Sequence, residues 1–248
     1  ENSRERRNFM DEGMDRIVGV LKRHLRPMLK FVRSKCRCTW PVSDYQFTSS
    51  ILRLLDALLD KQPELLAEAA LSASAAAALD NTIVWSIVWS VGATLSDENS
   101  RCVFSDFLIN RLQEHESMLS LLNSNGAGSA SGSSDSKEGK ESNAVKSAKL
   151  TLFDYYLDVK SGSLDPWMTK VESFEYNAAL PFAALFVPTV ESTRISFVMD
   201  LLIRTPRKNP EEVDALTGCH WGPRGDSSSV LLVGTSGVGK SVIARRFL

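Results

Sequence analysis

A glycine-rich segment near the end of the 248-residue sequence has the residue types and spacing of a phosphate-binding loop. The segment, which we call the P-loop, follows the pattern G-x-x-x-x-G-K-[ST] and consists of Gly234, Thr235, Ser236, Gly237, Val238, Gly239, Lys240 and Ser241. Glycines let the backbone fold into a nest whose N–H groups point at phosphate oxygens. We predict that Lys240 reaches the β- and γ-phosphates of ATP or ADP, and that the Ser241 hydroxyl ligates the Mg²⁺ of the nucleotide.

The segments on either side of the P-loop are those that such a loop requires. Residues 229–233 are apolar apart from Ser229 at their start, which predicts a buried strand leading into the loop. An apolar-patterned helix is expected to begin at the end of the loop, and its N-terminus favours anions. The order strand, loop and helix predicts the start of an α/β nucleotide-binding domain. A degenerate site that binds nucleotide without hydrolysing it stays open as an alternative.

No residue of this sequence is assigned a catalytic role. A P-loop ATPase holds Mg²⁺ with an acidic residue at the end of a second core strand. Asp200 ends an apolar run at residues 195–200, but this run precedes the P-loop and has helical spacing. Arg245 and Arg246 are expected on the solvated face of the helix after the loop, so no arginine finger is assigned. We therefore expect these residues alone not to hydrolyse ATP.

Composition and charge exclude some classes of partner. The net charge is −1, so the chain as a whole is not an electrostatic partner for nucleic acid or for a membrane. The apolar run at residues 83–92 is too short for a bilayer, which needs about 20 residues. The sequence has neither an initial Met nor an apolar signal region, and we expect it to be a fragment.

Two features near the N-terminus invite a functional interpretation and a plainer one. Cys36 and Cys38 are too closely spaced for a zinc knuckle and no second pair follows, so reduced thiols are expected. Residues 16–37 contain basic and no acidic residues. A surface for nucleic acid or an acidic partner is one interpretation, but the interleaved residues are aliphatic, which favours the solvated face of a helix.

Helical periodicity dominates the first half of the sequence. The predicted helices are residues 10–32 with a kink or break at Pro27, residues 48–59, the alanine-rich residues 64–79, residues 82–91, and a further helix that contains Phe104, Phe107, Leu108 and Leu112. Trp85 and Trp89 lie four residues apart, so both indoles are expected in one core, with an aromatic ligand cage as the alternative.

The second half is less regular. Residues 123–149 are rich in Gly, Ser, Lys and Glu, and this composition predicts a flexible insertion. Ordered structure is expected to return at Thr151, with a strand or extended arm at 152–157 and with Trp167 and Phe174 as anchoring side chains. A helix capped by Ser192 or Thr193 is predicted to end at Arg204, and a polar loop is predicted at 205–228. Ile195, Val198, Met199 and Leu202 are expected on one side of that helix.

A segment upstream of the P-loop resembles the dynein heavy chain family. The residues that carry the resemblance are Val187, Pro188, Thr189, Thr193 and Arg194, which are similar to the Val-Pro-Thr stretch at the start of the third AAA+ module of the dynein motor ring. The residues between them, Glu191 and Ser192, depart from those of many relatives. The resemblance implies that Val187, Pro188 and Thr189 lie along the nucleotide base.

Upstream residues agree with this resemblance. Residues 89–92 (Trp-Ser-Val-Gly) followed by Arg101 and Phe104 are similar to a block that precedes the third module, and residues 17–60 resemble the helical subdomain that closes the second module. The resemblance implies a regulatory ATP site in a microtubule motor. The partners that it implies are microtubules, dynein intermediate and light chains, and neighbouring AAA+ modules, without nucleic acid or membrane. It implies a location in the cytoplasm or cytoskeleton, with a cilium or flagellum axoneme favoured.

The predicted fold is mixed, with an α-helical N-terminal part followed by the start of a P-loop AAA+ α/β domain. The predicted parts are residues 1–62 as a helical small subdomain, 63–122 as a helical connection, 123–150 as the insertion, and 151–248 as the N-terminal part of an AAA+ module. Two alternatives stay open: another tandem AAA+ ATPase, such as a ribosome-assembly remodeller, and a non-catalytic helical scaffold with a vestigial P-loop.

Overall fold

The computed structural model of the chain describes residues 2–113, 151–174, 176, 185–204 and 232–247. Its α-helices are α1 (Asn2–Lys35), α2 (Asp44–Asp60), α3 (Leu65–Leu71), α4 (Ala73–Val91), α5 (Glu98–Gln113), α7 (Val190–Arg204) and α8 (Lys240–Phe247). Short 3-10 turns are η1 (Gly92–Thr94), η2 (Leu152–Asp154) and η3 (Trp167–Lys170), and the strands are β1 (Tyr155–Leu157) and β2 (Leu164–Pro166). Mostly helical structure with one small sheet agrees with a helical part followed by the beginning of an α/β domain.

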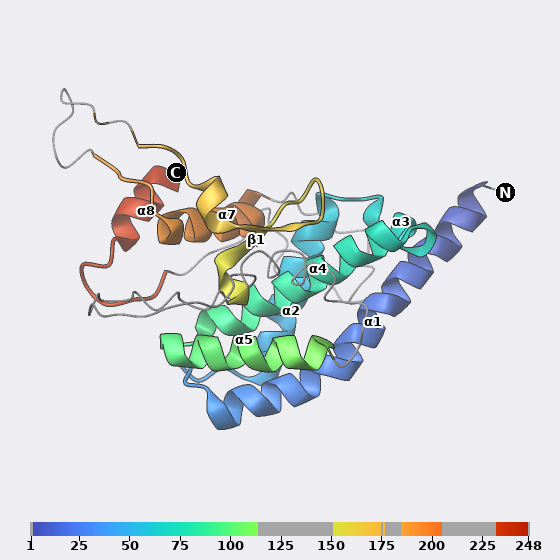
Figure 1. Cartoon of the computed structure of the whole chain (residues 1–248), viewed down its shortest axis with the longest axis horizontal. Coiled ribbons are helices and arrows are strands. Elements are labelled where there is room, and N and C mark those ends of the chain that lie inside the picture. The colour runs from blue at the N-terminus through green and yellow to red at the C-terminus, as the bar shows by residue number, and fades with distance from the viewer. Residues whose placement is uncertain (1, 114–150, 175, 177–184, 205–231, 248) are drawn as a thin grey trace, which may run out of the picture.

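The first helix is longer than its predicted range and is not split at Pro27. Helix α1 is continuous from Asn2 to Lys35, with Pro27 inside it, and its C-terminal part runs in a different direction from its N-terminal part (Figure 1). Of its apolar residues at helical spacing, Ile17, Met28 and Val32 are buried, and Leu21 and Leu25 are partly buried. Gly13 allows the N-terminal half to approach α3, because a Cβ atom there would lie 2.4 Å from the backbone oxygen of Leu66.

Helix α2 begins before its predicted start at Thr48. Ser43 is the N-cap: its hydroxyl accepts a hydrogen bond from the backbone N–H of Gln46, and the Gln46 side chain accepts one from the backbone N–H of Ser43. This reciprocal pair is a capping box, which satisfies two donors at the helix start. Ile51, Leu55 and Leu58 lie at helical spacing and are buried.

The alanine-rich segment predicted as one helix at 64–79 is divided at Ser72. Ser72 has an extended backbone, with φ −134° and ψ 133°, and separates α3 from α4. Its N–H donates to Glu68 at the end of α3, and its carbonyl accepts from Ala76 at the beginning of α4. High helix propensity did not keep the segment straight, because α3 packs on α1 while α4 packs on α2.

Helix α4 forms the centre of the structure. From Leu79 to Val88 every residue is buried, including Thr82 and Ser86. Their hydroxyls donate to carbonyls one turn back, Thr82 to Ala78 at 2.8 Å and Ser86 to Thr82 at 2.7 Å. The two hydroxyls are therefore satisfied within the helix, whereas the buried Asp80 and Asn81 bond to Arg16 and to the carbonyl of Gly162. With these polar groups paired, α4 can pack against α2, α3, β1 and η2.

The predicted strand at 152–157 is a strand only in its second half. Residues 152–154 form η2, in which Asp154 accepts hydrogen bonds from the N–H and hydroxyl of Thr151. Tyr155–Leu157 is β1, which pairs antiparallel with β2 in the register Tyr155 with Pro166 and Leu157 with Leu164. The turn between the strands contains Gly162, whose φ of +68° favours glycine.

An aromatic cluster joins α4 to the segments that follow residue 151. It consists of Trp85, Trp89, Phe153, Tyr156, Trp167 and Phe197. The rings meet mainly edge to face, as between Trp89 and Trp167 at 5.7 Å, which is a favourable arrangement of aromatic side chains. The rings fill a core, as expected for Trp85 and Trp89. Trp167 is the anchor that the sequence predicts, but Phe174 is 41% exposed, so its predicted anchoring role is wrong.

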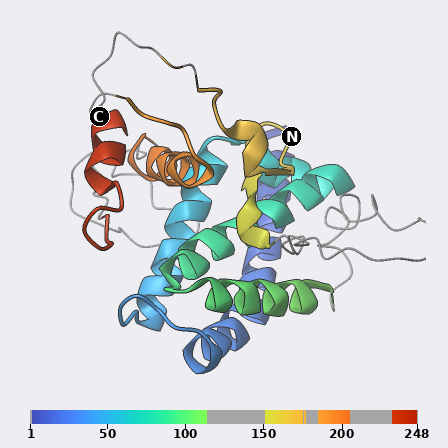
Figure 2. The same ribbon diagram turned by 60° about the vertical axis from the view of Figure 1, so that its left-hand side comes forward.

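Helices α7 and α8 lie side by side on the side of the molecule away from α5, and the two ends of the chain lie far apart (Figures 1 and 2). Met199 of α7 is buried as predicted, but Leu201 is the most enclosed residue of that helix. The insertion at 123–149, the loop at 205–228 and most of the predicted strand at 229–233 lie outside the described residues. Leu232 and Val233 are not in a strand. Among the described helices, none is long and apolar enough to cross a membrane.

Candidate functional site

The P-loop has the backbone conformation that its glycines predict. Gly237 and Gly239 have φ values of +82° and +83°, in the left-handed region that residues with a side chain rarely adopt. Gly234 is constrained differently, since a Cβ atom there would lie 3.1 Å from Cγ2 of Val238. Helix α8 begins directly after Gly239, whose carbonyl accepts hydrogen bonds from the N–H groups of Val242 and Ile243. The loop therefore leads into a helix N-terminus, as in phosphate-binding loops.

The Lys240 side chain folds back over the loop that precedes it. Its Nζ donates to the carbonyl oxygens of Gly234 at 2.8 Å and Thr235 at 2.6 Å. The ammonium group therefore lies over the same backbone that is proposed to surround phosphate oxygens, and it can exchange carbonyl for phosphate acceptors without leaving the loop. The donor set at this position, backbone N–H groups and one ammonium group, suits a phosphate chain.

The remaining P-loop side chains face solvent. Thr235, Ser236 and Ser241 are exposed, and Ser241 lies in the first turn of α8. Its hydroxyl is in the position predicted to ligate nucleotide-bound Mg²⁺. Among the described residues, no group of three or more His, Cys, Asp or Glu side chains could hold a metal ion by itself.

The segment expected along the nucleotide base leads into α7. Val187 and Thr189 are exposed, and Pro188 is partly buried. Thr189 caps the helix, because its Oγ1 accepts from the N–H of Ser192 at 3.2 Å and its own N–H donates to Oγ of Ser192 at 2.9 Å. The predicted cap at Ser192 or Thr193 is therefore wrong: Ser192 contributes to the cap from inside the first turn.

Arg246 connects the P-loop helix to this segment. Its Nη2 lies 2.7 Å from Oε2 of Glu172, and its Cζ lies 4.3 Å from the ring centre of Phe186, the residue before Val187. The side chain is 45% exposed, so the predicted solvated role is incomplete. Arg245 is exposed, as predicted. Sequence reasoning missed the Arg246 contacts because Glu172 lies 74 positions away.

Arg194 ties α7 to the helical part of the chain. Its Nη2 lies 2.9 Å from Oδ1 of Asp154 in η2, and its Nη1 lies 2.7 Å from Oε1 of Glu191. The Arg194 side chain is only 12% exposed, and the same Asp154 carboxylate caps Thr151. The arginine of the Val-Pro-Thr stretch therefore holds the start of α7 in place. Asp200 is helical as predicted and pairs with Lys61 at 3.4 Å.

Comparison with known proteins decides the family. The family model described as the dynein heavy chain AAA lid domain matches residues 17–169, which is more than half of the chain. The chain belongs to the dynein heavy chain family. The match favours dynein over the ribosome-assembly alternative. It also runs across the predicted domain boundaries at residues 62, 122 and 150, and those boundaries stay a prediction.

Individual dynein heavy chains are similar to this chain over part or nearly all of its length. The ciliary dynein beta chain of Heliocidaris crassispina is 38% identical over 93 residues, which are 38% of this chain and 2% of the relative. Human dynein axonemal heavy chain 6 is 25% identical over 243 residues, 98% of this chain and 5% of the relative. Human dynein axonemal heavy chain 17 is 37% identical over 93 residues, 38% of this chain and 2% of the relative.

The chain therefore spans a small part of the length of the dynein heavy chains that it matches, between 2% and 5% for these three. The relatives are ciliary and axonemal proteins by name, which supports the predicted location in the cytoskeleton of a cilium or flagellum.

Proposed function

We propose that the P-loop, residues 234–241, binds the phosphates of Mg-ATP or Mg-ADP and is a regulatory nucleotide site of a dynein motor ring. The observation that carries this proposal is the pair of left-handed glycines, Gly237 and Gly239, directly before Lys240 at the start of α8. Left-handed glycines are typical of nests, in which successive N–H groups face one anion, and a helix N-terminus adds positive potential. Both features favour a phosphate chain.

Each residue of the proposed site has a distinct task. The loop backbone would donate hydrogen bonds to the phosphate oxygens, and Lys240 would neutralise charge on the β- and γ-phosphates. Ser241 would supply one oxygen ligand to nucleotide-bound Mg²⁺. Val187, Pro188 and Thr189 would lie along the base, at the segment that Phe186 and Arg246 hold beside α8. The proposal concerns binding, and no catalytic residue is assigned.

The remaining parts of the proposal concern the whole protein. Membership in the dynein heavy chain family supports a motor that acts on microtubules within a complex. We infer that its partners are dynein intermediate and light chains and the neighbouring AAA+ modules of the same ring. Nucleotide at the proposed site would then regulate the motor, in the manner that the family resemblance implies.

Hydrogen exchange in the full-length protein tests the proposed site locally. Mg-ATP or Mg-ADP is expected to slow amide exchange in peptides that cover residues 234–247, because bound phosphates occupy the loop N–H groups. Lys240→Ala is expected to abolish this protection. Lys160→Ala, a change at an exposed lysine in the β1–β2 turn, is the control and should leave the protection intact. Unchanged exchange in the wild-type P-loop at saturating nucleotide would refute the proposal.

A further inference from the structure

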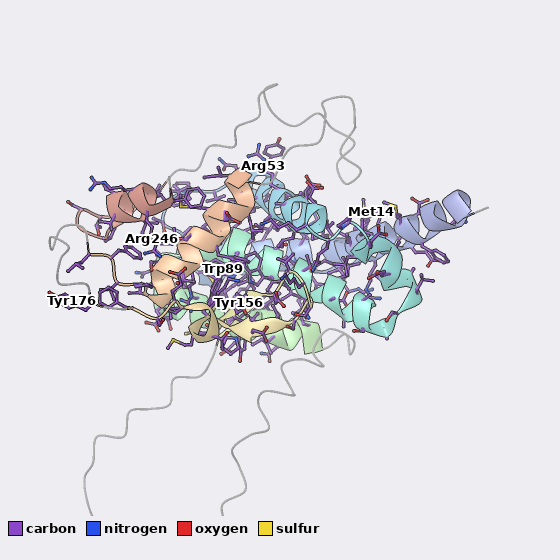
Figure 3. The ribbon with its side chains drawn as sticks, turned by 90° about the horizontal axis from the view of Figure 1, so that it is seen from above. Met14, Arg53, Trp89, Tyr156, Tyr176 and Arg246 are labelled. Carbon is purple, nitrogen blue, oxygen red and sulfur yellow. The ribbon has the colours of Figure 1, made fainter. Side chains whose placement is uncertain are left out.

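Arg246 occupies a junction between three parts of the chain. It lies in α8, the helix that begins with Lys240. Its guanidinium group pairs with Glu172, two residues beyond η3, and lies over the ring of Phe186. Figure 3 shows Arg246 near α7 and α8, at the end of the molecule opposite Met14. One side chain therefore contacts both Glu172, in the segment after η3, and Phe186, the residue before Val187.

The two contacts of Arg246 restrain it in different ways. The pair with Glu172 holds one guanidinium nitrogen at 2.7 Å, and the Cζ atom of Arg246 lies 4.3 Å from the centre of the Phe186 ring. A planar guanidinium can make both contacts at once, whereas an ammonium group would keep the charge without the flat face. Both contacts are partly exposed, so they are expected to contribute little to overall stability. Their effect is instead the placement of one segment relative to another.

We propose that Arg246 is a positioning residue that holds the segment Val187–Thr189 beside the P-loop helix and so gives the site its affinity for the nucleotide base. This inference rests on the proposed function of the P-loop. The phosphates would contact the loop, which is anchored in α8, while the base would contact Val187–Thr189, which leads into α7. Arg246 is the side chain that bridges these two supports through Phe186. Binding energy from the base depends on their relative position, and binding of phosphates alone does not.

The test compares Mg-ATP with magnesium tripolyphosphate, which has the phosphates but no base. The readout in the full-length protein is the ligand concentration that half-protects the amides of residues 234–247 from exchange. For Arg246→Ala we expect this concentration to rise about tenfold with Mg-ATP, the size of effect that loss of one or two weak positioning contacts produces, and to stay unchanged with tripolyphosphate. Arg245→Ala, a change at the exposed neighbouring arginine, should leave both values unchanged.

Two further variants separate the contacts of Arg246. Arg246→Lys retains a charge for Glu172 but loses the planar group beside Phe186. It is therefore expected to weaken the binding of Mg-ATP, but by less than Arg246→Ala does. Phe186→Leu should weaken the binding of Mg-ATP. Adding Arg246→Ala to this variant should then weaken Mg-ATP binding by less than Arg246→Ala does in the wild type, because the two side chains act together.

The outcomes separate this inference from the proposed function. Unchanged Mg-ATP affinity in Arg246→Ala would overturn the positioning role, and so would an equal loss for Mg-ATP and tripolyphosphate, since that result would place the effect in the loop itself. Neither result bears on binding by Lys240. If wild-type protein shows no nucleotide protection, or if Lys240→Ala retains it, the proposed function fails instead.

Discussion

The buried carboxylate of Asp80 illustrates how single residues of this chain stabilise the helical part. The Asp80 carboxylate accepts hydrogen bonds from Nε of Arg16 at 2.8 Å and from Nη2 at 2.6 Å. The Asp80 side chain is 2% exposed. The hydrogen bond and the charge of Asp80 raise the pKa of Arg16 above its ordinary value. Such a two-point pair fixes the geometry of α1 against α4, and removing Asp80 leaves the Arg16 charge, whose side chain is 36% exposed, only partly solvated.

Asp80→Asn is therefore expected to lower the free energy of unfolding by about 2 kcal/mol, less than for a pair with both partners buried because Arg16 is 36% exposed, measured by urea unfolding. The matched control is Asp44→Asn, which removes the carboxylate of the exposed pair Arg33–Asp44, where the side chains are 54% and 61% exposed. An exposed pair contributes less than about 1 kcal/mol, so the control should change stability little. Equal losses in the two variants would contradict the role assigned to burial.

The Cys36 thiol is expected to make the free energy of unfolding fall as the pH rises through the alkaline range. Burial, followed by the nearby Cys38 and Asp97, raises the pKa of the Cys36 thiol from 9.0 to about 11. As pH rises above 9, the unfolded chain ionises before the folded one, so the stabilisation present below pH 9 is lost by about pH 11. Under reducing conditions, wild-type protein should lose more stability than Cys36→Ala between pH 8 and about pH 10. Parallel losses would show that the Cys36 thiol has the same pKa in the folded and unfolded states, and would contradict the effect of burial.

At the scale of elements, close approach of an aromatic ring explains the glycine that ends α4. Gly92 has a helical φ of −66°, so its conformation does not require glycine. A Cβ atom there would lie 2.3 Å from Cζ of Phe153, which places the ring of η2 directly against the helix end. The Trp-Ser-Val-Gly block is thus a packing feature: Trp89 contributes a ring to the aromatic cluster, and Gly92 leaves room for Phe153.

Gly92→Ala is expected to destabilise the protein by about 1–3 kcal/mol, because the added methyl group displaces the Phe153 ring. Gly19→Ala is the control, since Gly19 lies within α1 and a Cβ atom there would have no neighbour within 4 Å. Alanine favours a helix over glycine, so this control should be stabilised by about 0.5–1 kcal/mol. Denaturant midpoints of the two variants that move in the same direction would contradict the assigned role of Gly92.

Local features were predictable from the sequence, and contacts between distant residues were not. The glycine pattern of the P-loop predicts the left-handed loop and the start of α8, because both depend on neighbouring residues. The spacing of Ser43 and Gln46 also carries the signal for the start of α2, whereas the range predicted from periodicity begins only at Thr48. The pair of Arg16 with Asp80 lies 64 positions apart, so no local pattern predicts it. The break at Ser72 likewise depends on packing of α3 and α4 against different helices.

At the scale of the whole molecule, side-chain contacts join α7 and α8 to the segments that precede them in the chain. Arg194 pairs with Asp154, Phe197 enters the aromatic cluster, and Arg246 reaches Glu172. Helix α7 is thus held to the helical part near its start and along its length, while α8 is held to α7 and to the segment around Glu172.

The number of nucleotides bound per chain tests the central proposal most directly. Equilibrium dialysis of the full-length protein with saturating Mg-ADP, with and without Lys240→Ala, measures this number without requiring turnover. Lys240 is assigned to the phosphates of one site, so the variant is predicted to bind fewer nucleotides by about one per chain, with Lys160→Ala unchanged. An identical number of bound nucleotides in wild-type protein and Lys240→Ala, at every concentration up to saturation, would contradict the assignment of residues 234–241 as a nucleotide site.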